Sequence, residues 1–416
     1  MGIMAGMTSD SRLKALASLR GLAVGDALGS QFFVPDNRGH FDRRTLPPGR
    51  WRWTDDTQMA CSVLQVLDAH GRIDADALAA SFAARHDVDR GYGAAANRLL
   101  RLVREGGDWR QLAAGLFDGQ GSYGNGAAMR VAPLGAWHAG DLDAAIAQAA
   151  AAAQVTHTHP EAVAGAVAVA VAAALVAAGE DPADPVEFLT AVAGHTPEGA
   201  VAAGIRAAAA IAAETDARQV GRVLGNGSAV SAPDTVPLTL WVAAHHRDDF
   251  TRAFWVTASA GGDVDTTCAI VGGILAARPG PDRPPSAWWA QTEPLPHWIG
   301  PHTWPITRPQ QITPPPRVYD GCEWECIQAG YTAVDMDEKW DLYVRDSWLY
   351  AHRSWTGNGI YAARFARDED GWRITTLHVE RNQDLYRGQD DAHDARLLEA
   401  LIDQHLLCPR GNAAAR

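Results

Sequence analysis

The chain has 416 residues, of which 36 are basic and 49 acidic, and its formal net charge is -13. This length allows two domains, or one large domain with an appended one, and a substantial core. The negative charge, without a dense run of Lys or Arg, argues against general binding to nucleic acid or to an anionic membrane. The five cysteines are scattered and odd in number, which argues against a disulfide framework and indicates a reducing compartment.

The N-terminal residues before Leu13 lack the apolar core of a signal peptide. We expect an irregular N-terminus and a cytoplasmic protein. From residue 11 to about 277, Ala-rich stretches at helical spacing alternate with Gly-rich loops. Ala is the best helix former, and these stretches predict an all-α bundle whose loops carry the chemistry. The predicted helices include 75–84, 142–153, 160–178 and 197–214.

One uncharged stretch, 162–179, is long enough to approach a membrane span. It consists mostly of Ala and Val, and small residues on every face suit a helix wedged among other helices. We therefore predict a buried core helix.

Composition changes after residue 278, where closely spaced prolines prevent a continuous helix up to 317. We expect this stretch to be a linker or an extended wrap along the surface, and we assign 306–317 as the Pro-rich linker between two domains. Beyond it, short runs rich in aromatic and branched residues predict strands at 340–344, 348–351, 360–365 and 372–377. A helix over 391–407 is predicted to close a small α+β domain, 318–416, to which we assign no role.

Two acidic clusters, 53–57 and 261–267, stand about two hundred residues apart and each contains two aspartates flanked by threonines. Clustered carboxylate and hydroxyl oxygens, with no His or Cys within either cluster, favour Mg²⁺ or Mn²⁺ over Zn²⁺. Together they predict the two halves of one metal site. A pair of acidic helix caps is the simpler alternative.

A Gly-rich block, 121–130, precedes a helix-prone segment. Glycine permits close backbone approach, and N–H groups at a helix start can bind a diphosphate. Arg130 is read either as a phosphate ligand or as part of a structural ion pair beneath the loop. His157 and His159 form a pair that could suggest a transition metal, but no third ligand lies nearby.

The order and spacing of these blocks, together with Gly21–Gly29, closely resemble the ADP-ribosylglycohydrolase family, which includes dinitrogenase reductase-activating glycohydrolase and the ADP-ribosyl-acceptor hydrolases. The resemblance covers residues 11–305 and implies an all-α orthogonal helical bundle. It also implies a Mg²⁺-dependent hydrolase that releases ADP-ribose from an ADP-ribosylated protein or small-molecule acceptor, with nucleic acid less expected as acceptor and no membrane involved.

The resemblance further implies the roles of individual residues. Two Mg²⁺ ions, with Mn²⁺ possible, would be held by Thr54, Asp55, Asp56, Asp263, Asp265 and Thr266. The ADP-ribose site would be lined by Gly121, Ser122, Tyr123, Gly124, Asn125, Gly126, Met129 and His157. Asp26 is expected to be structural, within the Gly-rich turn.

The chain departs from the family pattern at one position. Members with a catalytic Glu carry it shortly after the first Gly-rich block, where this chain has Phe33, and no Glu occurs between Gly21 and Trp53. The base that activates water would then be Asp55 or Asp56, or Asp36 folded in from the loop. Because the arginine-directed branch also lacks this Glu, the departure favours arginine N-glycosides.

Two other functions stay open. A protein with Phe33 in place of Glu could bind ADP-ribose without turnover, as a regulatory or immunity factor. Alternatively, the same scaffold could hydrolyse another nucleotide-like glycoside.

Overall fold

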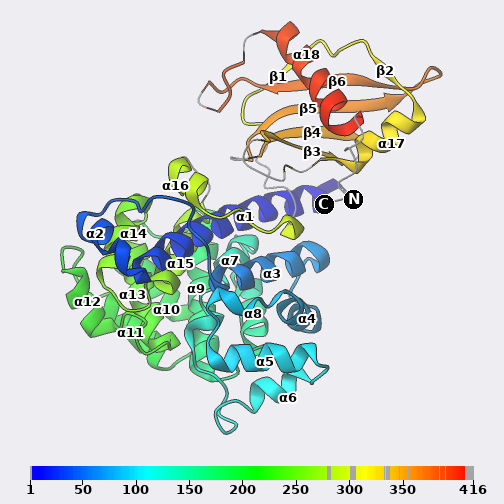
Figure 1. Ribbon diagram of the computed structural model, residues 1–416. Coiled ribbons are helices and arrows are strands. Elements are labelled where there is room, and N and C mark those ends of the chain that lie inside the picture. The colour runs from blue at the N-terminus through cyan, green and yellow to red at the C-terminus, as the bar shows by residue number, and fades with distance from the viewer. Residues whose placement is uncertain are drawn as a thin grey trace. The chain divides into compact units, whose positions relative to one another are not determined.

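The computed structural model describes residues 2–278, 283–299, 306–331, 333, 338–345, 347–354, 357–383, 385–388 and 390–407. The chain divides into unit 1, Met1–Ile299, and unit 2, Gly300–Arg416 (Figure 1). Each unit has its own hydrophobic core. Unit 1 is helical, and unit 2 contains an antiparallel sheet with helices. The predicted fold class, an all-α bundle followed by a small α+β region, is confirmed.

The described α-helices of unit 1 run in this order: α1 (Gly2–Ser30), α2 (Arg38–Arg43), α3 (Asp55–His70), α4 (Ala75–Arg85), α5 (Ala94–Arg104), α6 (Trp109–Ala114), α7 (Ala132–Trp137), α8 (Leu142–Gln154), α9 (Pro160–Ala178), α10 (Pro185–His195), α11 (Ala200–Ala208), α12 (Ala217–Leu224), α13 (Ala232–His246), α14 (Phe250–Ser259), α15 (Val264–Ala276) and α16 (Ser286–Gln291). Short 3-10 turns, among them η1 (Gln31–Phe33), η2 (Pro35–Asn37), η3 (Val88–Arg90), η4 (Asn125–Ala127) and η5 (His297–Ile299), join some of them.

Helices α1 and α15 pack with their backbones almost touching. A Cβ atom at Gly21 would lie 2.2 Å from the carbonyl oxygen of Gly272, and one at Gly25 would lie 2.1 Å from that of Cys268. Only glycine permits this approach, because any side chain at these positions would push the helices apart. The packing sets the end of α1 against the first turn of α15, where the second acidic cluster begins.

Helix α9 is the core helix that the sequence predicts. By length and composition it could cross a membrane, but 83% of its most apolar window is buried inside the protein. His159 caps its start by accepting a hydrogen bond from the Glu161 N–H at 3.1 Å, and Gly179, with φ of 73°, ends it. Such burial is typical of the central helix of a bundle.

Two predictions for unit 1 are wrong in extent. The N-terminus is not irregular, because α1 begins at Gly2. The helix predicted over 197–214 covers only Ala200–Ala208. Its start is fixed by Glu161, whose carboxylate accepts hydrogen bonds from the Ala200 and Val201 N–H groups at 2.7 and 2.9 Å. A distant side chain thus sets a boundary that local propensity could not give.

The strands of unit 2 are β1 (Pro309–Ile312), β2 (Val318–Tyr319), β3 (Trp340–Arg345), β4 (Trp348–Arg353), β5 (Gly359–Arg367) and β6 (Trp372–Glu380). They form an antiparallel sheet in the order β1-β6-β5-β4-β3, and β2 also pairs with β6. Helices α17 (Gly321–Ala329) and α18 (Asp391–Leu401), with the π-helical turn η6 (Ile402–Leu407), supply apolar side chains to the core of this unit (Figure 1). The four strands and the closing helix predicted for this region lie where the sequence places them.

The predicted linker, 306–317, is not simply a linker. Its residues Pro309–Ile312 form β1, which pairs with β6 from Pro309 opposite Glu380 to Ile312 opposite Leu377. The buried carboxylate of Glu380 also accepts hydrogen bonds from the N–H groups of Thr307 and Arg308, at 2.5 and 2.9 Å. An edge strand tolerates proline at its first residue, so the prolines do not prevent this pairing.

Candidate active site

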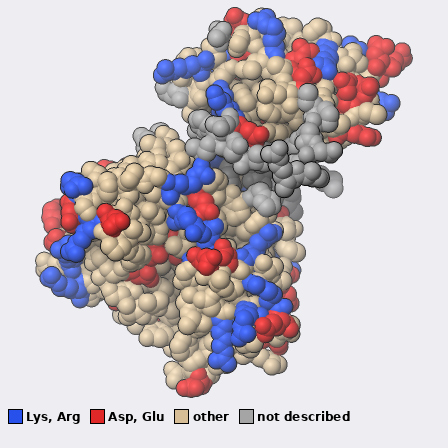
Figure 2. All heavy atoms as spheres, in the orientation of Figure 1, with Lys and Arg blue, Asp and Glu red and all other residues tan. Residues whose placement is uncertain are grey.

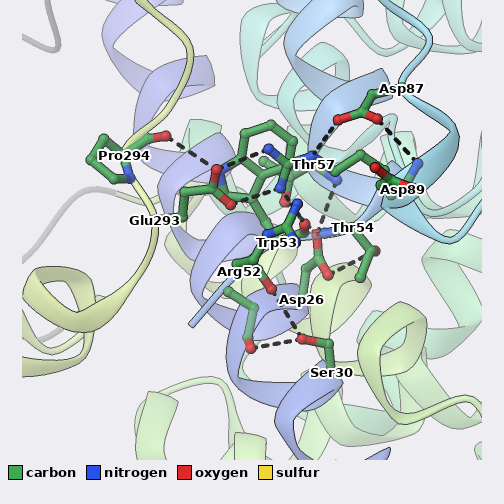
Figure 3. A network of polar contacts seen from close by, with 12 residues as sticks. Asp26, Ser30, Arg52, Trp53, Thr54, Thr57, Asp87, Asp89, Glu293 and Pro294 are labelled. Carbon is green, nitrogen blue, oxygen red and sulfur yellow. Dashed lines mark hydrogen bonds and ion pairs between the residues drawn. The ribbon is translucent and has the colours of Figure 1, made fainter. Parts of the chain in front are cut away.

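The first acidic cluster lies at the start of α3, and hydrogen bonds to Asp26 of α1 hold it in place. The fully buried carboxylate of Asp26 accepts hydrogen bonds from the N–H and hydroxyl groups of both Thr54 and Thr57, at 2.6 to 3.2 Å (Figure 3). The Thr54 hydroxyl also lies 3.0 Å from Asp56 Oδ2. The expectation that Asp26 is structural agrees with these contacts, which fix the loop that carries the first cluster.

The second acidic cluster lies at the start of α15, after two glycines with positive φ. The Asp263 N–H donates to the Asn226 carbonyl oxygen at 3.1 Å. A Cβ atom at Gly227 would lie only 2.4 Å from Asp263 Cβ, so the facing loop approaches as closely as glycine allows. Asp263 precedes the helix and Asp265 lies in its first turn, so both carboxylates belong to the helix start.

The fold brings the two clusters together. Asp26, Asp56 and Asp265 each offer a carboxylate oxygen, and the three oxygens lie within 4.8 Å of one another. The Thr266 hydroxyl lies 3.5 Å from Asp56 Oδ2, which links the clusters directly. The predicted residues thus converge from α3 and α15, and Asp26 joins them from α1.

Mutual burial makes these carboxylates hard to ionise together. Removal from water raises the pKa of Asp26 to about 6, and burial together with neighbouring carboxylates raises the pKa of Asp55 to about 7. The same causes hold the pKa of Asp56 and of Asp265 well above the ordinary value. A group of acids this closely packed is stabilised as carboxylates by a bound cation.

The residues present fit a hard divalent cation. Asp56 Oδ1 is buried and has no hydrogen-bond partner among the described residues, as expected of an oxygen that awaits a ligand. The donors gathered here are carboxylate and hydroxyl oxygens, the set that Mg²⁺ and Mn²⁺ prefer. The histidine pair is not part of the group: among the described residues, the cluster that could hold a metal ion contains three aspartates and no histidine.

The Gly-rich block lies against the second acidic cluster. The Asn125 amide donates to Asp263 Oδ2 at 2.7 Å and to the Thr235 hydroxyl at 3.1 Å. Asn125 begins the 3-10 turn η4, and Gly124 before it is extended. The predicted nucleotide loop and the predicted metal ligand Asp263 are therefore in direct contact.

The remaining residues of the block differ in exposure. Ser122 and Met129 are buried, Gly121 has φ of 75°, and Tyr123 is 48% exposed with its ring 5.6 Å from that of His159. Arg130 is fully buried beneath the loop. Its described partners are neutral acceptors, so the ion pair predicted for it is not found among the described residues.

His157 lies under the same loop with its ring edge facing two of the glycines. A Cβ atom at Gly124 would lie 3.2 Å from His157 Nε2, and one at Gly126 would lie 3.0 Å from it. The other ring nitrogen, Nδ1, is 2.7 Å from the Thr156 hydroxyl. His159, in contrast, caps α9, so the two histidines serve different partners.

A second network, around Arg90, supports the first acidic cluster, and its partner Glu293 was not anticipated from the sequence. Arg90 donates to the Trp53 carbonyl oxygen at 2.9 Å and to both carboxylate oxygens of Glu293 at 2.7 and 2.8 Å. Its guanidinium also lies 3.5 Å from the centre of the Trp53 ring. Figure 3 shows Trp53 and Glu293 beside Thr54, which follows Trp53 in the chain.

The segment 291–294 completes this network. Trp51 N–H donates to the Gln291 carbonyl oxygen at 2.7 Å, and Glu293 N–H donates to the Trp51 carbonyl oxygen at 2.8 Å. The Trp53 indole N–H donates to the Pro294 carbonyl oxygen at 3.3 Å. We call 291–294 the strap, because it runs alongside 51–53 at the start of the first acidic cluster.

The position of the missing Glu is open to solvent. Phe33, at the end of η1, is 55% exposed. Asp36, considered as a replacement base, lies exposed on η2. Of the carboxylates considered as the base, Asp55 and Asp56 lie in the cluster itself.

Charges on the visible face of unit 1 are mixed. Figure 2 shows Lys and Arg side chains interspersed with Asp and Glu side chains over this face. The buried aspartates therefore form a local acidic site within a surface of both signs.

Comparison with known proteins identifies the class to which this fold and site belong. The family model described as ADP-ribosylglycohydrolase matches residues 7–305. The chain is a member of the ADP-ribosylglycohydrolase family. The match includes both acidic clusters, the Gly-rich block and the strap, and it ends before the sheet of unit 2.

Individual relatives agree with this assignment. The chain is 34% identical over 128 residues to the ADP-ribosylhydrolase ARH3 of Xenopus tropicalis, which covers 27% of this chain and 36% of that protein. It is 42% identical over 86 residues to ARH3 of Homo sapiens, which covers 20% of this chain and 24% of that protein. The chain thus spans about a third or less of the length of these relatives.

Longer matches come from a bacterial protein and a solved structure. The uncharacterized protein YegU of Escherichia coli strain K12 is 30% identical over 298 residues, covering 64% of this chain and 87% of YegU. A chain from a structure titled "ADP-ribosylglycohydrolase-related protein complex" superposes with a TM-score of 0.51 at 26% identity, covering 68% of this chain and 94% of that one.

Proposed function

We propose that the protein is a Mg²⁺-dependent hydrolase that cleaves the glycosidic bond between ADP-ribose and an acceptor and releases ADP-ribose. One observation carries this proposal: the aspartates of two clusters two hundred residues apart converge next to the Gly-rich loop, with Asn125 bonded to Asp263 at 2.7 Å. Family membership supports the same reaction class. A cytoplasmic location is part of the proposal.

The proposal assigns two groups of residues. Two Mg²⁺ ions, or Mn²⁺ in their place, would be held by Thr54, Asp55, Asp56, Asp263, Asp265 and Thr266. When bound, such ions supply Lewis-acid stabilisation of ribose oxygens. The loop from Gly121 to Met129 and the imidazole of His157 would hold the ADP-ribose.

The reaction needs a base for the attacking water. In hydrolysis, the bond from the anomeric carbon to the acceptor nitrogen or oxygen breaks, a bond to the water oxygen forms, and the water proton passes to a carboxylate while the acceptor gains a proton. Asp55 and Asp56 are the carboxylates we assign to this step, and the partial exposure of Asp55 favours it over the buried Asp56.

The acceptor we propose first is protein arginine. Phe33 replaces the Glu that some members carry, and the arginine-directed members resemble this chain in lacking it. The printed name ARH3 says only that those relatives are ADP-ribosylhydrolases, so the acceptor is a separate question.

Detection of free ADP-ribose by mass spectrometry tests the proposal. The protein and Mg²⁺ are incubated with ADP-ribosylated arginine, serine and nucleobase substrates, and Asp265→Asn serves as the metal-site control. Release that disappears with Asp265→Asn supports a metal-dependent hydrolase and names its linkage. No release from any of the three would refute hydrolysis of these linkages.

The exposed Phe33 favours one second candidate, a protein that binds ADP-ribose without turnover. Calorimetric titration with ADP-ribose separates the two functions. Binding without release from any substrate would support the binding protein, and release with turnover would refute it.

A further inference from the structure

Three polar side chains beneath the Gly-rich loop are joined by a buried series of hydrogen bonds. The Arg130 guanidinium is 2.8 Å from the Thr156 hydroxyl, and that hydroxyl is 2.7 Å from His157 Nδ1. Arg130 is fully buried, and Thr156 is 2% exposed. This series of hydrogen bonds connects the protein interior to His157, a residue assigned to the ADP-ribose site.

The direction of the first hydrogen bond is fixed by chemistry. A guanidinium has donors and no acceptor, so Arg130 donates and the Thr156 oxygen accepts. Arg130 also donates to the Ala152 carbonyl oxygen at 3.0 Å, which holds the guanidinium in place.

The direction of the second hydrogen bond follows from the hydroxyl proton. Within the described part of the chain, His157 Nδ1 is the one acceptor that the structure gives this proton. If Nδ1 instead carried a proton and donated to Thr156, the oxygen would accept twice and its own proton would be buried without a partner. Burial of an unsatisfied donor is costly, so Thr156 donates and Nδ1 accepts.

The imidazole is also uncharged. Burial and the nearby guanidinium of Arg130 lower the pKa of His157 to about 3. A neutral imidazole carries one proton, and when Nδ1 accepts a hydrogen bond the proton is on Nε2.

The Nε2 edge faces the loop that the proposed function gives to ADP-ribose. A Cβ atom at Gly124 or Gly126 would lie 3.2 or 3.0 Å from Nε2, so the two glycines let the loop backbone approach this edge of the ring closely. A donor at this edge pairs with an acceptor oxygen of a ligand.

We propose that Arg130 and Thr156 are positioning residues that fix His157 as the Nε2–H tautomer, so that it offers a hydrogen-bond donor to a hydroxyl or phosphate oxygen of the bound nucleotide. The identity of this ligand rests on the proposed function. The tautomer itself rests only on the three side chains.

The tautomer can be measured without any ligand. In protein labelled with ¹⁵N-histidine, two-bond proton–nitrogen correlation spectra distinguish a ring nitrogen that carries a proton from one that does not. His157→Gln identifies the signals of His157, and His159→Gln is the matched control from the same turn. We expect Nδ1 of His157 to lack the proton, and a protonated Nδ1 would overturn the proposal.

Two variants test the role of the hydroxyl. Thr156→Val keeps the shape and removes the donor, whereas Thr156→Ser keeps the donor. We expect Thr156→Val to populate the other tautomer and to weaken ADP-ribose binding in Mg²⁺ by roughly tenfold, with Thr156→Ser close to the parent protein. Equal spectra and equal affinity for Thr156→Val would overturn the proposal.

The experiments distinguish failure of the proposed function from failure of the proposed tautomer of His157. If the parent protein neither binds ADP-ribose nor releases it from any substrate, the proposed function fails while the spectra still decide the tautomer. If ADP-ribose binds but the spectra show Nδ1–H, the tautomer fails while the function stands.

Discussion

Asp26 shows how one buried residue organises a site to which it was not assigned. It sits in an otherwise apolar part of α1, and its carboxylate accepts four hydrogen bonds from Thr54 and Thr57. Replacement by Asn would set amide protons against some of these donors, although the shape is kept. Asp26 therefore governs the geometry of the first acidic cluster.

We predict that Asp26→Asn weakens Mn²⁺ binding by about 10- to 100-fold, because residues that orient metal ligands typically have effects of this size. Titration followed by electron paramagnetic resonance measures the free Mn²⁺. The matched control is Asp76→Asn, which changes an exposed carboxylate that pairs with Arg110 and belongs to neither acidic cluster. Unchanged affinity in Asp26→Asn would show that the loop holds its shape without the carboxylate.

A second prediction concerns Gly126. A Cβ atom there would lie 2.9 Å from His157 Cε1, so Gly126→Ala must displace the ring or the loop. We expect roughly tenfold weaker ADP-ribose binding by calorimetry. Gly194→Ala, at an open position in α10, is the control. If Gly126→Ala bound ADP-ribose as well as the parent protein does, the loop would not be the nucleotide site.

At the residue scale, the sequence singled out Asp56 and Asp265, but not Asp26, among the three aspartates that meet, and it did not predict the side chains that support them. Two Asp-rich clusters with a Gly-rich block form a local pattern that can be read directly. Arg90, Glu293 and Trp53 meet only in the folded chain, and nothing in their local sequence pairs them. Support of this kind depends on long-range packing.

At the element scale, the approach of α1 to α15 decides whether the two clusters meet. We predict that Gly25→Ala destabilises the protein by about 3 kcal/mol, because its Cβ would lie 2.1 Å from the Cys268 carbonyl oxygen and the helices must separate. Urea denaturation measures the free energy of unfolding. Gly194→Ala should instead stabilise α10 by up to about 1 kcal/mol.

The same variant has a second readout. Separation of α1 from α15 moves Asp26 away from Asp265, so Gly25→Ala should also bind Mn²⁺ more weakly at temperatures where it is still folded. A destabilised protein with unchanged Mn²⁺ affinity would mean that the site does not depend on this packing.

The sequence predicted where most of these helices and strands lie, but it predicted their first and last residues less well. Ala-rich spacing located α4, α8 and α9, and aromatic runs located β3 to β6. The prediction failed where a distant group sets the boundary, as Glu161 does for α11. It also missed β1. The prolines near β1 are typical of a linker, and the strand forms only because it pairs with β6, which lies far along the chain.

At the scale of the whole molecule, two separate cores predict two unfolding events. Scanning calorimetry should show two transitions for the full chain, since units 1 and 2 each bury their own cluster of apolar side chains. Because the proposed metal ligands all lie in unit 1, Mg²⁺ at one hundred times its dissociation constant should stabilise the unfolding transition of unit 1 alone, by about 2.7 kcal/mol. A single transition, or an equal shift of both, would contradict independent units.

The strap bears on how the enzyme could be shortened. Every proposed metal ligand and nucleotide contact precedes residue 268, and a fragment that ended there would seem to contain the whole site. Such a fragment would lack Glu293 and Pro294, and with them the hydrogen bonds that hold Arg90 and Trp53 beside Thr54. The shortest fragment that keeps this support therefore extends about thirty residues past Thr266, the last proposed metal ligand. We expect an insertion or a protease cut within 291–294 to lower activity, although no proposed ligand lies in that segment.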